Sequence, residues 1–229
     1  MAGRLVIEGL ACGRSGRLVV PPLGLALAPG EAVLVTGENG AGKSTLLRTL
    51  AGLLPPLAGT IRVENFHAAD GEPARSLADI AHYLGHRNAL KGARRVGAEL
   101  AFWARFLGGS PGLSPEAALS ELGLPEGVAG LRCADLSAGQ ARRAALARLL
   151  VTPRPVWLLD EPTNALDAAT QARFAALCRQ HLASGGLILA TTHQPLDLGP
   201  AVRSLVLEPI RADAAPADST DEEGWEAIA

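Results

Sequence analysis

The segment GENGAGKST, residues 37–45, has the residue types and spacing of a phosphate-binding loop. It matches G-x-x-x-x-G-K-[ST] and lies between an apolar strand-like run and a helical pattern, which is the context such a loop requires. Its glycines allow successive backbone N–H groups to turn toward phosphate oxygens, and the helix that begins here directs its positive end at the same charge. The residues expected to contact the nucleotide are Gly37, Glu38, Asn39, Gly40, Ala41, Gly42, Lys43, Ser44 and Thr45.

Within this loop, three side chains have distinct expected tasks. Lys43 is expected to reach the β- and γ-phosphates, Ser44 to place its hydroxyl on Mg²⁺, and Thr45 to meet the α-phosphate. The chain uses arginine almost throughout and keeps lysine only at positions 43 and 91. A compact ammonium fits among crowded phosphate oxygens where a guanidinium does not, so lysine at position 43 supports the phosphate-binding interpretation.

Two carboxylates and a histidine follow other apolar runs. VWLLDE ends in Asp160 and Glu161, and LILATTH ends in His193. Because neighbouring residues of a strand point to opposite sides, the two carboxylates can have separate roles. Asp160 is expected to accept a Mg²⁺-bound water or to bind the metal in the second shell, and Glu161 to orient and deprotonate an attacking water. His193 is expected to contact the γ-phosphate, so that Lys43, Glu161 and His193 form the predicted catalytic set.

A second candidate anion site lies in LSAGQ, residues 136–140, at the start of a run of helix-forming residues. The Ser137 side chain can cap the helix that follows, and the positive end of that helix favours an anion. Taken alone, the pattern is also that of an ordinary serine-capped helix. What this site would bind depends on the rest of the chain.

The P-loop, the two carboxylates and the histidine each follow an apolar run, so a fold that brings the ends of these runs together would form one site. The runs EAVLVT, VWLLD and LILATT are apolar on both faces and alternate with helical patterns, which is typical of parallel strands covered on both sides. Ligands gather at the carboxyl ends of such strands. The predicted core is therefore a parallel sheet with the catalytic groups at one edge.

Other segments are expected to flank this core. RLVIEGLACGRSGRLVV and TIRVEN have the pattern of antiparallel strands, and residues 94–123 are expected to form a separate helical insert. The predicted fold class is thus α/β, a P-loop fold with an antiparallel β subdomain and a helical subdomain. Residues 211–229 are rich in acid, alanine and proline and are expected to form a mobile acidic tail.

Composition places limits on the class of protein. A chain of 229 residues with 48% hydrophobic content fits a globular protein with one substantial core. The net charge of −2 disfavours a nucleic-acid partner, which normally requires excess positive charge. Cys12, Cys133 and Cys178 have no metal-ligand spacing and are expected to be core residues. Because no apolar run reaches the roughly 18 residues of a membrane span, and Glu8 interrupts any signal peptide, we expect a cytoplasmic location.

The combined pattern resembles the ATP-binding subunits of ABC transporters over about residues 5–207. The P-loop, LSAGQ, the acidic pair, NALD and the histidine occur in the order of that family, whose signature is usually LSGGQ, so that Ala138 replaces one glycine. The resemblance implies ATP and Mg²⁺ as ligands and a homodimer in which each signature closes over the partner's ATP. The implied nucleotide-binding residues in this second region are Ser137, Gly139, Gln140 and Asp167. The ATP-binding domain would span residues 1–210, with its helical subdomain at about 88–150.

A closer resemblance is to the ATP-binding subunits of bacterial cytochrome c maturation complexes. It is carried by YLGHRNALK, LSAGQARRAALARLL, WLLDEPTNALD and LATTHQPL. The resemblance implies an ATPase docked on integral membrane subunits at the cytoplasmic face of the bacterial inner membrane. Its hydrolysis would serve haem export or the release of a haem-loaded chaperone, with no nucleic-acid partner.

Two positions depart from the ABC pattern. Where the family carries a glutamine before its helical subdomain, this chain has His86, which is either a nucleotide-site residue or an ordinary loop histidine. No aromatic residue is present to stack on adenine near the first hairpin, and either Arg14 or Arg17 could stack there instead or be a solvated loop residue. The remaining histidines are expected to be ordinary surface or packing residues: His67, His82 and His181.

Two other functions compete with the transport ATPase. A soluble ABC ATPase acting on ribosomes or nucleic acid typically has two cassettes, a long coiled-coil insert or a basic surface, and the sequence has none of these. A nucleotide sensor that binds without hydrolysing would be expected to lose the carboxylate at Glu161 first. The lack of a second cassette, a coiled-coil insert or a basic surface, and the presence of Glu161, favour the transport ATPase.

Overall fold

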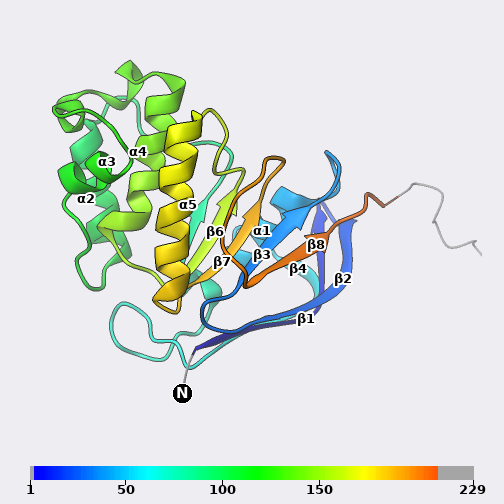
Figure 1. The fold of residues 1–229 in the computed structure, drawn as a ribbon. Coiled ribbons are helices and arrows are strands. Elements are labelled where there is room, and N and C mark those ends of the chain that lie inside the picture. Colours follow the sequence, from blue (N-terminus) through cyan, green and yellow to red (C-terminus); the bar gives the residue numbers. More distant parts are fainter. Residues whose placement is uncertain (1–2, 211–229) are drawn as a thin grey trace, which may run out of the picture.

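The computed structural model describes residues 3–210, which form a five-stranded sheet, a three-stranded sheet and a group of helices (Figure 1). The acidic tail expected at 211–229 lies outside the described residues. No helix within residues 3–210 combines the length and the apolar character that a bilayer span requires. The α/β fold class predicted from the sequence is confirmed.

The five-stranded sheet has the order β5-β6-β7-β3-β8, and all of its pairings are parallel. Its strands are β3 (Ala32–Thr36), β5 (Ala81–Leu84), β6 (Val156–Asp160), β7 (Leu187–Thr191) and β8 (Val202–Val206). The three central strands are those predicted from continuous apolar runs. The two edge strands were not predicted, because β5 has only four residues and β8 exposes most of its side chains.

The three-stranded sheet is antiparallel, with the order β2-β1-β4. It consists of β1 (Arg4–Arg14), β2 (Arg17–Leu27) and β4 (Pro56–Glu64). The predicted hairpin and the later strand are thus both present, and β2 and β4 are longer than expected. β2 continues through two prolines because it lies at the edge of its sheet, where a missing N–H costs no ladder hydrogen bond.

The helices are α1 (Lys43–Leu50), α2 (Val96–Leu107), α3 (Pro115–Glu121), α4 (Ala138–Val151) and α5 (Ala168–Ala183), with short 3-10 turns at Leu77–Asp79, Val128–Gly130 and Cys133–Asp135. In Figure 1, α2, α3 and α4 gather at one end of the molecule, and α5 lies between them and the sheet. The predicted insert at residues 94–123 contains α2 and α3. It is not packed separately, because both helices share a buried core with α4, α5 and the sheet.

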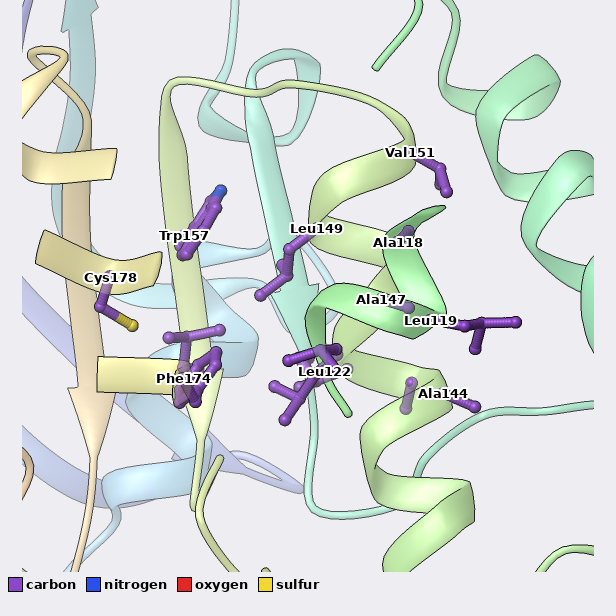
Figure 2. Packing of buried hydrophobic residues seen from close by; sticks show 14 of the residues in the cluster. Ala118, Leu119, Leu122, Ala144, Ala147, Leu149, Val151, Trp157, Phe174 and Cys178 are labelled. Carbon is purple, nitrogen blue, oxygen red and sulfur yellow. The ribbon is translucent and has the colours of Figure 1, made fainter. Parts of the chain in front are cut away.

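Two hydrophobic clusters cover opposite faces of the parallel sheet. Trp157 and Leu159 of β6 belong to the cluster under α4 and α5, whereas Leu158 faces the cluster that contains α1 and the antiparallel sheet. Figure 2 shows side chains of the first cluster between α3, α4, α5 and β6. The expectation of a sheet buried on both faces is met. The three cysteines are also buried, as expected.

Two of the packing histidines are held neutral, His82 fully buried and His181 half-buried. The His82 Nε2–H group donates to the Thr152 carbonyl oxygen at 2.7 Å, and the His181 ring stacks on Trp157 with ring centroids 3.9 Å apart. Burial lowers the pKa of each imidazole from 6.5 to about 4. Both histidines therefore serve packing, and they link stability to pH.

We expect acid to destabilise the protein through these two imidazoles. Below about pH 6.5 these imidazoles become protonated in the unfolded chain but stay neutral in the folded chain until about pH 4. The free energy of unfolding therefore falls by about 2 kcal/mol for each histidine between pH 7 and pH 5. His82→Gln keeps an N–H donor without the titration and should remove about 2 kcal/mol of this loss, measured by urea unfolding at both pH values. The exposed His67→Gln is the control, and an equal acid loss in His82→Gln and wild type would contradict the prediction.

Candidate functional site

The P-loop joins the end of β3 to the start of α1, and its glycines are required by backbone geometry. Gly37 has a φ of 138°, and a Cβ there would lie 2.1 Å from the Leu207 carbonyl oxygen. Gly42, which precedes α1, has a φ of 97°, and a Cβ there would lie 2.6 Å from Val20. Any other residue at these two positions would clash and be strained. The loop therefore holds its backbone close to the strands beneath it.

The Lys43 ammonium lies inside this loop. Its Nζ donates to the carbonyl oxygens of Gly37 at 2.7 Å and Glu38 at 3.0 Å, and the residue is 8% exposed. Two of its three N–H groups are thus committed to the loop, which leaves one for a further acceptor. The charge sits at the N-terminus of α1, where an anion is favoured.

Asp160 connects the P-loop to the sheet. Ser44 and Thr191 donate through their hydroxyl groups to Asp160 Oδ1, at 3.0 Å and 2.9 Å. The other oxygen, Oδ2, is buried and has no partner within the described part of the chain. A buried acceptor without a donor is costly, and carboxylate and hydroxyl oxygens are the groups that Mg²⁺ prefers. Ser44 and Asp160 therefore fit a magnesium ion with its bound waters.

Thr191 contacts both carboxylate residues and was not predicted from the sequence. It ends β7 directly opposite Asp160 in β6, and its hydroxyl both donates to Asp160 and accepts from the Glu161 N–H at 3.0 Å. The residue is fully buried. The only signal in the sequence was a threonine pair at the end of an otherwise apolar strand.

Glu161 follows the end of β6 in a left-handed conformation, with a φ of 51°. For a residue with a Cβ, this costs on the order of 1–3 kcal/mol and persists only where surrounding contacts enforce it. Its Oε2 accepts from the His193 backbone N–H at 3.3 Å, and its Oε1 lies 3.4 Å from His193 Nε2. Asp160 contacts Ser44 and Thr191 whereas Glu161 contacts His193, and Glu161 lies in a left-handed turn after the strand and not in the strand itself.

One pocket of about 630 Å³ brings most of the predicted residues together. It is lined by Arg14, Val19, Asn39, Gly40, Gly42, Lys43, Ser44, Thr45, His86, Glu161, Asn164 and His193. The P-loop, Glu161, His193 and His86 thus meet in the folded chain although they come from four segments. Val19 and Asn164 were not predicted, and Arg17 is not among the lining residues.

The residues implied by the second anion site lie elsewhere on the surface. Ser137 begins α4 in a capping box: the Gln140 N–H donates to Ser137 Oγ at 3.3 Å, and the Ser137 N–H donates to Gln140 Oε1 at 2.9 Å. Asp167 caps α5 by accepting from the Thr170 N–H at 2.7 Å, and this bond lowers the pKa of Asp167. The lining of the P-loop pocket in the same chain does not include Ser137, Gly139, Gln140 or Asp167. Ser137 and Asp167 are both exposed.

Comparison with known proteins gives concordant results. A family model described as ABC transporter matches residues 20–164. The cytochrome c biogenesis ATP-binding export protein CcmA of Rhodopseudomonas palustris (strain BisB5) is 54% identical over 83% of this chain and 92% of its own length. The protein of the same description from Rhizobium meliloti (strain 1021) is 49% identical over 84% of this chain and 92% of its own length.

Solved structures share the fold at lower sequence identity. A putative ABC transporter ATP-binding protein from Pyrococcus furiosus has a TM-score of 0.72 at 23% identity, covering 88% of this chain and 97% of that one. The ATP-binding cassette MJ0796, described as a dimer in a post-hydrolysis state with ADP and Pi, has a TM-score of 0.73 at 22% identity, covering 90% and 97%. These likenesses concern the arrangement of helices and strands.

Proposed function

The chain belongs to the ABC transporter family, among the cytochrome c biogenesis ATP-binding export proteins, and from that membership we propose that it hydrolyses ATP to drive a membrane complex of cytochrome c biogenesis. The observation that carries the proposal is the single pocket in which Lys43, Glu161 and His193 converge. The ATP-binding domain would span residues 1–210, with the helical subdomain at about 88–150.

The residues of the pocket account for the steps of hydrolysis. The P-loop N–H groups and Lys43 would bind the β- and γ-phosphates. Glu161 would orient a water and take its proton, the water oxygen would bond to the γ-phosphorus, and the bond to the β,γ-bridging oxygen would break. ADP and phosphate would then leave. His193, held against Glu161, would contact the γ-phosphate.

Ser44 and Asp160 would hold magnesium beside the phosphates. When bound with the nucleotide, Mg²⁺ would neutralise part of the charge on the β- and γ-phosphate oxygens. The unpartnered Asp160 Oδ2 supports this assignment, since a Mg²⁺-bound water would supply the missing donor.

Asp160→Asn is expected to weaken the apparent Mg²⁺ affinity by about 10- to 100-fold, because an amide keeps Oδ1 for Ser44 and Thr191 but removes the charge. A titration of ATPase activity against Mg²⁺ measures the shift. Asp197→Asn, at an exposed carboxylate paired with Arg179, is the matched control. An unchanged Mg²⁺ dependence in Asp160→Asn would remove this residue from the metal site.

Two further residues of the pocket have proposed contacts. Arg14 lines the pocket beside Val19, and we infer that its guanidinium stacks on adenine. His86 lines the same pocket, and we infer that it contacts the nucleotide in place of the usual glutamine. Arg17 has no such support, since it is absent from the lining.

We propose that the chain works as a head-to-tail homodimer. Ser137, Gly139, Gln140 and Asp167 would contact ATP held by the partner copy, which accounts for their distance from the pocket of their own chain. The dimer would dock on integral membrane subunits at the cytoplasmic face of the bacterial inner membrane. Its cargo would be haem or a haem-loaded chaperone, and no nucleic acid would take part.

Co-purification from membranes tests this function. The tagged chain is expected to bring down integral membrane subunits of cytochrome c maturation, and a strain that carries Lys43→Ala in place of the native residue is expected to lose c-type cytochromes. Lysine 91, outside the P-loop, provides the control substitution Lys91→Ala. Recovery of ribosomes or DNA instead of membrane subunits would overturn the proposal.

A further inference from the structure

Arg142 is a buried arginine whose five N–H donors are all used. It lies in the first half of α4 and is 3% exposed. Its Nε donates to the Pro162 carbonyl oxygen at 3.0 Å, and its Nη1 to the Gly85 carbonyl oxygen at 3.0 Å and Asn88 Oδ1 at 3.2 Å. Its Nη2 donates to the carbonyl oxygens of Asp160 at 3.1 Å and Glu161 at 2.5 Å. A guanidinium has no further donor to offer.

None of these five acceptors is a carboxylate oxygen. Burial lowers the pKa of Arg142 to about 10, while the nearby charges of Asp160 and Glu161 act to raise it, so the group stays charged at neutral pH. The planar fork of the guanidinium thus holds four backbone carbonyl groups and the Asn88 side-chain amide, a task for which lysine has neither the donors nor the geometry.

The five acceptors belong to two segments that carry nucleotide-site residues, and Arg142 itself belongs to a third. Asp160 is the last residue of β6, and Glu161 and Pro162 follow it directly. Gly85 and Asn88 flank His86. Arg142 lies five residues after Ser137, in the helix that Ser137 caps. One side chain therefore ties the capped start of α4 to the strand end that carries the catalytic carboxylate.

Glu161 depends on such support because its backbone is in the left-handed region. Its N–H donates to the carbonyl and hydroxyl oxygens of Thr191, and its carbonyl oxygen accepts from Arg142 at 2.5 Å and from the Asn164 N–H at 3.3 Å. The peptide groups on both sides of the Glu161 Cα are thus hydrogen-bonded, one by the sheet and the other by α4 together with the turn that follows Glu161. Arg142 is therefore the contact that joins α4 to the Glu161 peptide group.

We propose that Arg142 is a positioning residue that couples the two nucleotide sites of the dimer. The inference rests on the proposed function, in which each copy gives Glu161 to the site on its own P-loop and Ser137 to the site on its partner. Arg142 links α4, which contacts the partner's nucleotide, to Glu161, which acts on the chain's own nucleotide. It thereby fixes the position of α4 relative to Glu161.

Arg148 offers a matched control in the same helix. It is 5% exposed, its guanidinium lies 3.9 Å from the Trp103 ring centroid, and it donates to the Asn88 and Ala89 carbonyl oxygens at 3.3 Å and 3.5 Å. It has no hydrogen bond to the end of β6. Arg142→Lys and Arg148→Lys each keep the charge and lose a buried guanidinium, so both are expected to lower the melting temperature.

The first measurement is the steady-state rate of ATP hydrolysis, which reports how well Glu161 is placed in the site of its own chain. With Glu161 intact, Arg142→Lys is expected to lower kcat about tenfold to a hundredfold and to change KM for ATP less than about threefold, because misplacement rather than lost binding slows the reaction. Arg148→Lys should change kcat less than about twofold per folded molecule, since its contacts do not reach Glu161.

The second measurement follows the partner's site, in chains where Glu161→Gln stops turnover. The ATP concentration that gives half-maximal dimer is expected to rise at least about fivefold when Arg142→Lys is added, and not when Arg148→Lys is added. A normal dimer with reduced kcat would make Arg142 a local support of Glu161 and overturn the coupling. Equal effects of the two arginine variants would also overturn it. Failure of Glu161→Gln alone to form an ATP-dependent dimer would overturn the proposed dimer itself.

Discussion

Glu161→Gln is expected to slow ATP hydrolysis by about 10²- to 10⁴-fold, the range for loss of a general base, while ATP binding persists. Glutamine has nearly the same shape and keeps an oxygen that can accept from the His193 backbone N–H, but it cannot take a proton from water. The P-loop contacts of Lys43 and the Ser44–Asp160 bond do not involve this side chain, so the nucleotide affinity should change little. Steady-state phosphate release and ATP binding to the purified chain measure the two quantities separately.

The same substitution is expected to trap a dimer. If ATP joins the two copies and hydrolysis separates them, a chain that binds without turnover accumulates in the closed form, visible by size-exclusion chromatography with ATP and Mg²⁺. Glu8→Gln is a suitable control, because Glu8 is an exposed carboxylate paired with Arg62 on the antiparallel sheet. Turnover equal to wild type in Glu161→Gln would remove Glu161 from the role of general base.

The parts of the site that could be predicted from sequence are those encoded by a short local pattern. The P-loop requires glycine at fixed positions, and the structure shows the reason at Gly37, where a Cβ would meet the Leu207 carbonyl oxygen. The central strands were predictable because burial on both faces demands unbroken apolar runs. Edge strand β8 is largely exposed, so its sequence has no unbroken apolar run that would indicate a strand, and only the structure shows that it pairs with β3.

The parts that escaped prediction depend on contacts between distant segments. Thr191 acts on Asp160 across a pairing of β6 with β7, 31 residues apart in sequence. Arg142 looks in sequence like a surface arginine of a helix, yet all its donors face the end of β6 and the loop around His86. A sequence shows such a residue's type but not which carbonyl groups the fold brings to it. Tertiary structure was needed to separate Arg142 from the exposed arginines.

Ser137→Ala is expected to reduce ATP hydrolysis by about 10²- to 10³-fold, the effect of removing one donor that stabilises developing charge, with little change in ATP affinity of the monomer. The hydroxyl lies on the surface and outside its own chain's P-loop pocket, so a monomer binds nucleotide without it. Only when a second copy presents Ser137 to the γ-phosphate would the hydroxyl contribute to the reaction. Measurement of kcat in the assembled complex and of nucleotide affinity in dilute monomer distinguishes the two stages.

Loss of the helix cap must be separated from loss of this contact, because the Ser137 hydroxyl also accepts the Gln140 N–H. Ser114 provides the comparison, since its hydroxyl caps α3 by accepting the Ala117 N–H at 3.2 Å and takes no part in the proposed site. Each alanine substitution should cost about 1 kcal/mol of stability. If turnover falls equally in both variants, the effect of Ser137 is one of helix stability. If it falls only in Ser137→Ala, and ATP affinity of the monomer is retained, the hydroxyl acts on the nucleotide of the partner copy.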